Sequence, residues 1–452
     1  MSGLPLIIAF VIAIIVMILA ISKFRIHAFL SIMGISLIFA IIAGIPLKDI
    51  PGIIGAGFSG TFSSIGIVII FGALIGTLLE KTCAALKMSD CVVRLVGKKH
   101  PELAMLIMGW IVSIPVFCDS GFVILNPIRK ALVKRTGASS VAMTMCLSLG
   151  LYISHCFIPP TPGPIAAANT LGIGDNLLLV IGLGALLSIP ALLAAYFFAK
   201  YIGKKVRAND EAESADDGEV VKTYEELVAS YGKLPNAWVS FAPIVVPILL
   251  MALASAFSMA KISVPLIAFM GTPIIALAVG AIIAIIVLFN SKKGSSFYEL
   301  TNETLKVTGP ILFVTAAGGV LGKVIASTSM VPYITENTTI LSTIGIFFPF
   351  ILAAILKSAQ GSSTVSLTTT AGIMAPLMVT MGLDTPILAA LTVIAIGAGA
   401  MTVSHANDSY FWVVTNFGSM KTQDGYKTQT LGTLFVGLAS MVGVYIAYLF
   451  MK

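Results

Sequence analysis

Long uninterrupted runs of apolar residues recur along the whole chain, with short polar segments between them. Because a transmembrane helix needs about 20 consecutive apolar residues, this pattern predicts an all-α polytopic membrane protein. The runs of the first half cover residues 3–22, 26–46, 61–80, 103–131, 137–173 and 176–199. Those of the second half cover residues 239–259, 264–290, 304–326, 340–378, 386–417 and 428–451.

Two of these runs are interrupted and cannot be ordinary crossings. The run 103–131 is broken at residues 115–121 and is flanked by Lys and Arg at both ends, and the run 340–378 is broken at residues 358–363. Each is predicted to be a re-entrant hairpin that enters and leaves on the same side of the membrane. Each half of the chain then contains five transmembrane helices and one re-entrant hairpin.

Five crossings are an odd number, so the second half is predicted to insert upside down relative to the first. The sequence therefore predicts two inverted repeats, residues 1–199 and 237–452, joined by a cytoplasmic linker at 200–236 that carries 8 acidic and 6 basic residues. In this arrangement 22 of the 27 Lys and Arg residues are cytoplasmic. By the positive-inside rule, both termini are predicted to be periplasmic.

Matching motifs at nearly constant offsets support the internal repeat. Gly72 and Gly76 correspond to Gly318 and Gly322, and the pair Ser154-His155 corresponds to Ser404-His405. Inverted repeats with broken helices at matching positions are typical of secondary transporters. The alternative is that Gly and Ser coincide by chance in the two halves.

Composition excludes several other classes of protein. Hydrophobic residues make up 58% of the 452 positions and charged residues only 10%, against about 25% charged in soluble domains. A soluble enzyme, a disordered chain and a nucleic-acid binder are therefore excluded. The net charge of +7 is interpreted as orienting the chain in the bilayer. The five cysteines form no CxxC pair, so neither a disulfide framework nor a metal site is expected. No cofactor is expected either.

The candidate site lies where helices break inside the membrane, because a non-helical backbone there must be surrounded by protein or a water-filled cavity. Four breaks are predicted, near residues 117–122, 154–164, 360–364 and 404–409, and the inverted symmetry would bring them together at the midplane. The predicted substrate-binding residues are Asp119, Ser120, Gly121, Thr161, Asn169, Gly361, Ser362, Ser363, Thr364 and Asn407.

The chemistry of these breaks favours a small anionic polyhydroxy substrate. Broken helices present N-termini whose N–H groups and dipoles favour an anion, and hydroxyl and amide side chains suit the rest of such a molecule. Coupling requires a group that changes charge inside the membrane. The candidates for proton coupling are Asp119, His155, His405 and Asp408.

Simpler roles remain open for each of these candidates. The two histidines would, in that case, donate structural hydrogen bonds to broken-helix carbonyls, and the two aspartates would cap helices. Glu80, Lys323 and Lys357 are interpreted as interfacial or locally paired.

The motifs at the four breaks together resemble the gluconate permease family of bacterial proton symporters, and the likeness extends over essentially the whole chain. The motifs are FCDSGF at 117–122, PPTPGP at 159–164, GSSTV at 361–365 and SHAND at 404–408. The resemblance implies proton-driven uptake of gluconate or a related compound across the bacterial inner membrane. Relatives in the family handle other sugar acids, glycerate and D-serine. The wider ion-transporter superfamily implies a homodimer in which a transport domain moves against a scaffold as an elevator.

One position departs from the family. Members commonly have His between the two proline pairs, where this chain has Thr161. A proton relay or substrate contact through that histidine is therefore absent here, which leaves the substrate and the coupling ion open.

Other functions are weaker on the sequence. A sodium-coupled carrier of small carboxylates is the alternative within transport, since carbonyl and amide oxygens at the breaks can coordinate Na⁺. An intramembrane enzyme lacks a nucleophile motif around Ser404, His405 and Asp408. A channel has no need of two matched hairpins.

Overall fold

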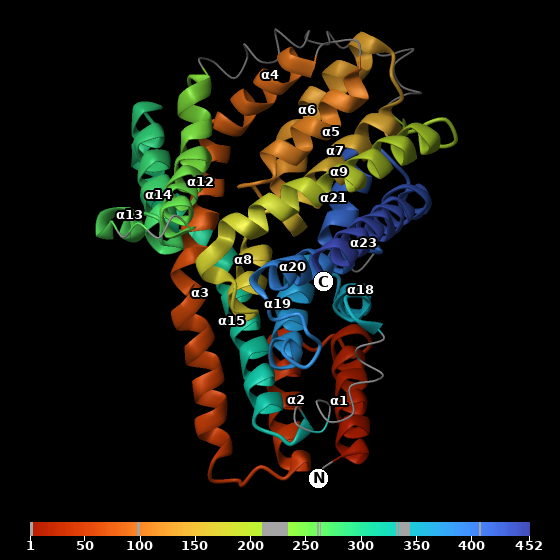
Figure 1. The fold of residues 1–452 in the computed structure, drawn as a ribbon. Coiled ribbons are helices and arrows are strands. Elements are labelled where there is room, and N and C mark those ends of the chain that lie inside the picture. The colour runs from red at the N-terminus through yellow and green to blue at the C-terminus, as the bar shows by residue number, and fades with distance from the viewer. Residues whose placement is uncertain are drawn as a thin grey trace.

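The computed structural model describes residues 3–96, 100–209, 234–259, 262, 264–330, 333, 344–405 and 408–452. The described part of the chain is entirely helical and contains no strand, as the hydrophobic pattern predicted (Figure 1). Most of the predicted linker, residues 210–233, lies outside the described residues.

The helices of the first half follow the order of the predicted runs. They are α1 (Leu4–Ser22), α2 (Ala28–Ala43), α3 (Ile50–Lys81), α4 (Ala84–Val96), α5 (Pro101–Val112), α6 (Cys118–Thr136), α7 (Ser140–Phe157), α8 (Pro162–Thr170) and α9 (Leu177–Ile202). A 3₁₀ turn, Gly174–Asn176, precedes α9.

The second half begins after the linker. Its helices are α12 (Ala237–Met259), α13 (Pro265–Met270), α14 (Pro273–Asn290), α15 (Phe297–Ala326), α18 (Phe347–Gln360), α19 (Ser363–Met374), α20 (Pro386–Met401), α21 (Ser409–Phe417), α22 (Thr422–Gly425) and α23 (Leu431–Met451). Short 3₁₀ turns lie at Gly294–Ser296 and Ala375–Leu377, and a π-helical stretch, Tyr426–Thr430, leads into α23.

Several boundaries differ from the prediction, and α15, for example, begins at Phe297 instead of residue 304. Helix α3 begins at Ile50 instead of residue 61 because its first turns are rich in glycine, which lowers their hydropathy without ending the helix. The run 264–290 is two helices, α13 and α14, separated at Gly271 and Thr272 before Pro273. Residues 84–96, expected to be part of a polar segment, form the amphipathic helix α4, which buries Leu86 and Met88.

Helices are interrupted at three of the four predicted places, whereas the first interruption lies at 113–117 and most of the predicted segment 117–122 opens α6. The interruptions separate α5 from α6, α7 from α8, α18 from α19 and α20 from α21. Between α7 and α8 the cause is the proline-rich segment, since proline lacks the N–H that a continuing helix needs. Between α18 and α19 it is Gly361, whose φ of 85° is left-handed and therefore ends α18 at low cost.

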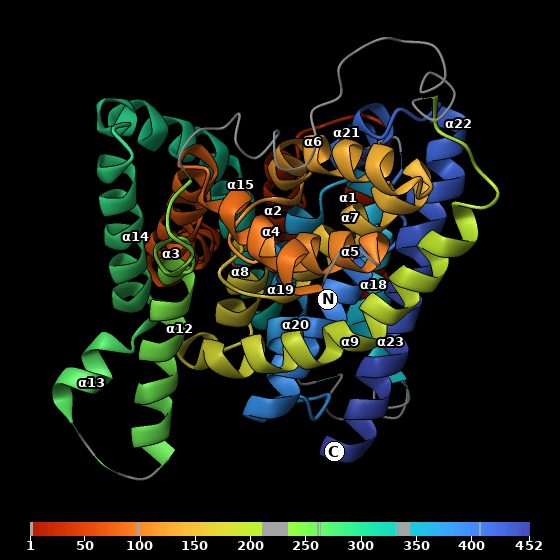
Figure 2. The same cartoon turned by 90° about the horizontal axis from the view of Figure 1, so that it is seen from above.

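Long helices from the two halves pack side by side. Helix α3 runs along α15 (Figure 1). Viewed from above, α12, α13 and α14 form one flank with α3, and α23 lies at the opposite flank (Figure 2). Helix α9 runs across the molecule from beside α12 to α23 (Figure 2). The broken helices α7–α8 and α20–α21, together with α18–α19, lie between these flanks.

Glycines allow the long helices to approach the breaks closely, which is the usual means of helix association in a membrane. A Cβ at Gly72 of α3 would lie 2.6 Å from the carbonyl oxygen of Pro160, and one at Gly322 of α15 would lie 2.5 Å from that of Gly372. The glycine pairs that the repeat singled out thus face helices of the broken-helix region in both halves.

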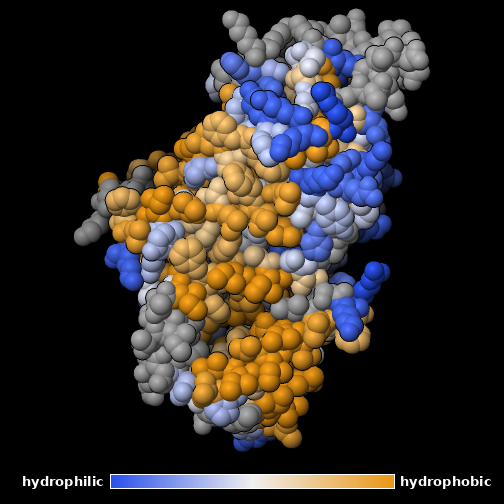
Figure 3. Space-filling view, turned by 90° about the vertical axis from the view of Figure 1, so that its right-hand side faces the viewer, coloured by the Kyte–Doolittle hydropathy of each residue, from blue (hydrophilic) through white to orange (hydrophobic). Residues whose placement is uncertain are grey.

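The outer surface is apolar over a broad area. Figure 3 shows hydrophobic residues covering much of one face, with hydrophilic residues gathered mainly toward one end. Exposed apolar side chains such as Leu193 and Phe197 on α9 and Val442 on α23 contribute to this surface. By length and composition, six described helical stretches could cross a membrane: Ser140–Thr170, Gly174–Ile202, Ala237–Ala254, Pro273–Asn290, Gly294–Ala326 and Thr422–Met451.

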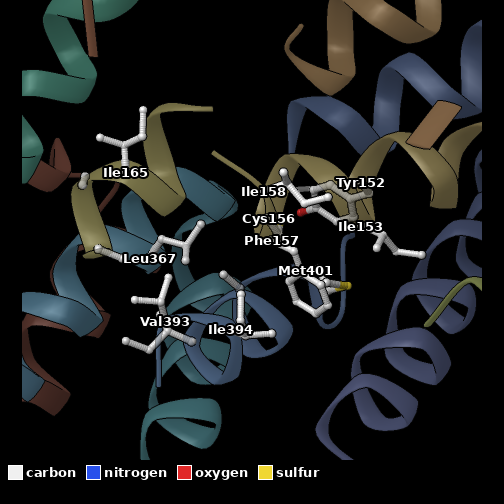
Figure 4. Packing of buried hydrophobic residues seen from close by; sticks show 14 of the residues in the cluster. Tyr152, Ile153, Cys156, Phe157, Ile158, Ile165, Leu367, Val393, Ile394 and Met401 are labelled. Carbon is white, nitrogen blue, oxygen red and sulfur yellow. The ribbon is translucent and has the colours of Figure 1, made fainter. Parts of the chain in front are cut away.

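A buried apolar core supports the broken helices. Phe157, the last residue of α7, packs toward α20 near Ile394 and Met401, and Leu367 of α19 lies beneath α8 (Figure 4). Gly397 of α20 lets the end of α7 approach, since a Cβ there would lie 2.5 Å from the carbonyl oxygen of Cys156. This packing fixes the positions of the breaks relative to one another.

Candidate functional site

A buried ion pair lies where α18 meets the break before α21. Lys357 Nζ, from the last turn of α18, is 2.6 Å from Asp408 Oδ2, and the two side chains are 0% and 6% exposed. The ammonium also donates to the carbonyl oxygen of Gly361 at the end of α18 and lies 5.6 Å from the ring centre of Tyr152 on α7. Residues of α7, α18 and the fourth break therefore meet at one buried charge pair.

Asp408 is fully engaged by its surroundings. Its Oδ1 accepts a hydrogen bond from the backbone N–H of Tyr410 at 3.1 Å, which caps α21. Its Oδ2 accepts from Ser404 Oγ at 2.5 Å as well as from Lys357. The capping role considered from the sequence is thus present, and a charge partner is present beside it.

Asp119 joins the start of α6 to the same break. It lies in the first turn of α6, where the helix dipole favours a negative charge. Its Oδ1 accepts a hydrogen bond from Ser409 Oγ at 3.1 Å, and Cys118 Sγ is 3.5 Å from its Oδ2. Since Asp119 is only half-buried and Ser409 is exposed, this pair lies closer to the surface than Lys357 and Asp408.

The two candidate histidines have different surroundings. His405 Nε2 lies 3.0 Å from the carbonyl oxygen of Ser358 in the last turn of α18, which is the structural bond considered for it. His155 is buried at the end of α7, with its ring 6.0 Å from that of Phe117 and stacked at 6.4 Å on that of Tyr152. Within the described part of the chain, its Nδ1 has no hydrogen-bond partner.

The N-termini of α8 and α19 approach each other beside this cluster. The Cα of Thr364 is 3.7 Å from the position of a Cβ on Gly163. Ser362 caps α19, its Oγ accepting from the N–H of Val365 at 3.3 Å. Prolines at 162 and 164 leave α8 with fewer free N–H groups than an ordinary helix start, so α19 offers the better anion-binding end.

Thr161 lies in the proline-rich break between α7 and α8, where the resemblance led us to expect histidine. Its buried hydroxyl lies 2.8 Å from the carbonyl oxygen of Ile158 and 3.0 Å from that of His155, so it stabilises the break between α7 and α8. Asn169 is not brought to this cluster, since it lies near the end of α8 and donates to the carbonyl oxygen of Ile165 within its own helix.

The remaining predicted residues are distributed as follows. Gly121 follows Asp119 in α6 and packs against Leu151 of α7. Ser363 is buried at the start of α19. The side chain of Ser120 and the whole of Asn407 lie outside the described residues. Among the described residues, no group of three His, Cys, Asp or Glu side chains could hold a metal ion.

Lys357 is the residue that the sequence interpretation placed wrongly. It was expected to be interfacial or locally paired, but it is fully buried, and its charge partner Asp408 is 51 residues away. Its position four residues before Gly361, inside an apolar run, was the available signal. Tyr152 and Tyr410 were also not foreseen, although both are buried and their rings lie 5.1 Å apart beside the pair.

Replacing Ser404 with Ala should destabilise the protein. The change removes a hydrogen bond of 2.5 Å to a buried carboxylate, and such bonds contribute about 1.5–3 kcal/mol. We expect a lower Tm in thermal unfolding of the purified protein in detergent. Ser440→Ala is the control, because this buried hydroxyl only bonds the carbonyl oxygen of Val436 within α23. Equal losses of Tm for the two variants would contradict the assigned role of Ser404.

These features define a class of protein. An all-helical chain with several apolar helices, interrupted inside the molecule at four places that carry buried charges and hydroxyls, is a membrane transporter. Residues 4–450 match the family described as GntP family permease. The chain belongs to this family and is a permease, not an enzyme. It is a multi-pass protein of the inner membrane.

Known proteins with similar sequences extend over nearly the whole chain. An uncharacterized permease of Haemophilus influenzae is 33% identical over 426 residues, which is 92% of this chain and 86% of that one. The gluconate permease of Zymomonas mobilis is 27% identical over 454 residues, which is 98% of this chain and 97% of that one. The fold is similar to that of the Alcanivorax borkumensis YdaH transporter, with a TM-score of 0.65, 13% identity, and coverage of 93% of this chain and 98% of that one.

Proposed function

We propose that this permease imports gluconate or a related small sugar acid or hydroxy acid by proton symport. The observation that supports this most is the meeting of the four breaks around Asp119, Lys357 and Asp408. Placing a charged side chain inside a membrane costs free energy. Such side chains are therefore rare there and typically mark substrate or ion pathways. The name of the Zymomonas mobilis relative, a gluconate permease, supports the choice of substrate class.

Each part of the site has a role in this proposal. The N-terminus of α19 with Ser362, Ser363 and Thr364 binds the anionic end of the substrate, because free N–H groups and hydroxyls at a helix start favour a carboxylate. Asp119 is the coupling group closest to the aqueous side. His155, whose Nδ1 is unpartnered within the described residues, is the candidate for passing a proton onward.

The wider architecture belongs to the same proposal. The two halves act as inverted repeats, α5–α6 and α18–α19 as re-entrant hairpins, and both termini are periplasmic. The protein works as a homodimer in which the hairpins and broken helices move as a unit against a scaffold containing α3 and α15. The close contacts of Gly72 and Gly322 with the broken-helix region are compatible with such a boundary.

Uptake of labelled gluconate into proteoliposomes tests the function directly. We expect accumulation when the outside is acidic and no accumulation under a Na⁺ gradient alone. Preloaded unlabelled gluconate should accelerate entry of the label, as counterflow through a carrier does and diffusion through a channel does not. Accumulation that requires Na⁺ and ignores the proton gradient would instead favour the sodium-coupled carrier. Glycerate and D-serine, tested as competitors, decide among the related substrates.

A further inference from the structure

Few charged side chains are fully buried in the described part of the chain, and they occur in three places. Arg129 of α6 bonds Asn126, Ser140 and the carbonyl oxygen of Phe417. Asp90 of α4 pairs with Lys87 at 2.9 Å. Lys357 and Asp408 form the third place, and of the three only this pair lies at the helix breaks. The proposed function rests on the presence of this pair but gives Lys357 no role of its own.

The pair connects α18 to the break before α21, so it must open if the tip between α18 and α19 moves away from that break. Lys357 belongs to α18 and bonds the carbonyl oxygen of Gly361 at the hairpin tip, while Asp408 begins α21. Lys357 is fully buried beneath this tip. A substrate bound at the N-terminus of α19 would therefore lie directly beside the ammonium once the tip moves.

The net charge of the buried pair restricts what it can bind. The lysine and the aspartate together are neutral, and a charge left unpaired in such surroundings costs several kcal/mol. A carboxylate that entered alone would leave the site with a net negative charge. A carboxylate that enters together with one proton leaves the site neutral, as one ammonium, one carboxylic acid and one substrate carboxylate.

We propose that Lys357 receives the carboxylate of the transported acid, and that it becomes available for this role when Asp408 takes up the co-transported proton. This inference rests on the proposed function. The proton comes from the aqueous side and forms an O–H bond with a carboxylate oxygen of Asp408. The ammonium keeps its three protons and exchanges one carboxylate partner for another. Release of substrate and proton restores the original ion pair.

Other titratable groups surround the pair and are part of the same electrostatic environment. Asp119 of α6 is a second carboxyl group near the pair, and it accepts a hydrogen bond from Ser409. The groups that face the pair from α6, α7, the fourth break and α21 are Asp119, Cys118, Tyr152, His155, Cys156, His405 and Tyr410. Among these groups only the two histidines can carry a positive charge, so only a protonated histidine would compete with Lys357 for a carboxylate.

Binding of gluconate to the purified protein, measured by calorimetry in buffers of different ionisation enthalpy, tests the inference. The wild-type protein should take up one proton per gluconate bound, and the Kd should rise about tenfold per pH unit where the free pair is ionised. Asp408→Asn, which imitates the protonated acid, should bind gluconate without proton uptake and with a Kd independent of pH. Lys357→Gln should weaken binding at least about tenfold, since a charged hydrogen bond is lost.

A double variant keeps the test valid if either single variant fails to fold. Lys357→Gln with Asp408→Asn removes both charges, so no unpaired charge stays buried. We expect this protein to fold, as judged by Tm and gel filtration, and to bind no gluconate. Lys323→Gln is the control, because this exposed lysine of α15 lies outside the site. It should bind gluconate with proton uptake like the wild type.

Two results would overturn the inference, and they can be told apart. If the wild type binds and accumulates gluconate with proton uptake, but the folded double variant does so equally well, the pair is only structural. The proposed function then stands and the role of Lys357 is rejected. If the wild type neither binds nor accumulates any of the acids tested, the proposed function itself fails, and the inference fails with it.

Discussion

Replacing Asp119 with Asn should abolish proton-driven uptake of gluconate while the protein still folds and reaches the membrane. The carboxylate is half-buried at the start of α6 and is held by Ser409 at 3.1 Å, so it joins the start of α6 to the fourth break. Asparagine preserves the size of the side chain and an acceptor oxygen, but it cannot take up a proton. Accumulation in proteoliposomes under a pH gradient should therefore fall to that of protein-free vesicles.

A matched control separates this effect from a general loss of negative charge. Asp384→Asn changes an exposed aspartate before α20, outside the candidate site, and should leave accumulation unchanged. Counterflow exchange distinguishes two roles of Asp119. If Asp119→Asn still shows counterflow, Asp119 is a coupling group. If the variant shows no counterflow, Asp119 contacts the substrate. Wild-type accumulation in Asp119→Asn would exclude both roles.

The positions of the helix breaks could be predicted from sequence because they depend on local chemistry. Proline at 159, 160, 162 and 164 cannot supply the hydrogen bonds of a continuous helix, and Gly361 adopts a left-handed φ. A family resemblance then follows from motifs at the same places. The start of α3 could not be predicted in this way, because its glycine-rich first turns have low hydropathy. The contact of Gly57 with Val320 of α15 is a tertiary contact that the hydropathy of one segment does not reveal.

The charge pairing of the site could not be predicted, because it depends on how distant segments pack. Lys357 and Asp408 are joined across 51 residues only when α18 folds against the break before α21. A lysine in a predicted membrane segment is more often close to the interface, where its charged head reaches water. Likewise, Asn169 has the right chemistry for a polar substrate, but it lies near the far end of α8 and bonds within that helix.

Replacing Gly76 with Ala should reduce both the stability of the protein and its rate of uptake. Gly76 lies on α3 against the break between α5 and α6, where a Cβ would overlap the carbonyl oxygen of Pro115. Backbone atoms cannot rotate away from such a contact, so α3 or the break must shift, and overpacking of this kind costs about 1–3 kcal/mol. Because Asp119 lies only four residues after Pro115, the shift also displaces this candidate coupling group.

Gly60→Ala on the same helix provides the comparison, because nothing lies within 4 Å of a Cβ there. Alanine favours a helix over glycine by about 1 kcal/mol, so this variant should keep or raise the Tm and should transport gluconate like the wild type. The two variants add the same methyl group to the same helix and differ only in what that group meets. A Tm for Gly76→Ala as high as that of Gly60→Ala would mean that α3 yields at this contact, and that the first break is positioned by α7 and α21 instead.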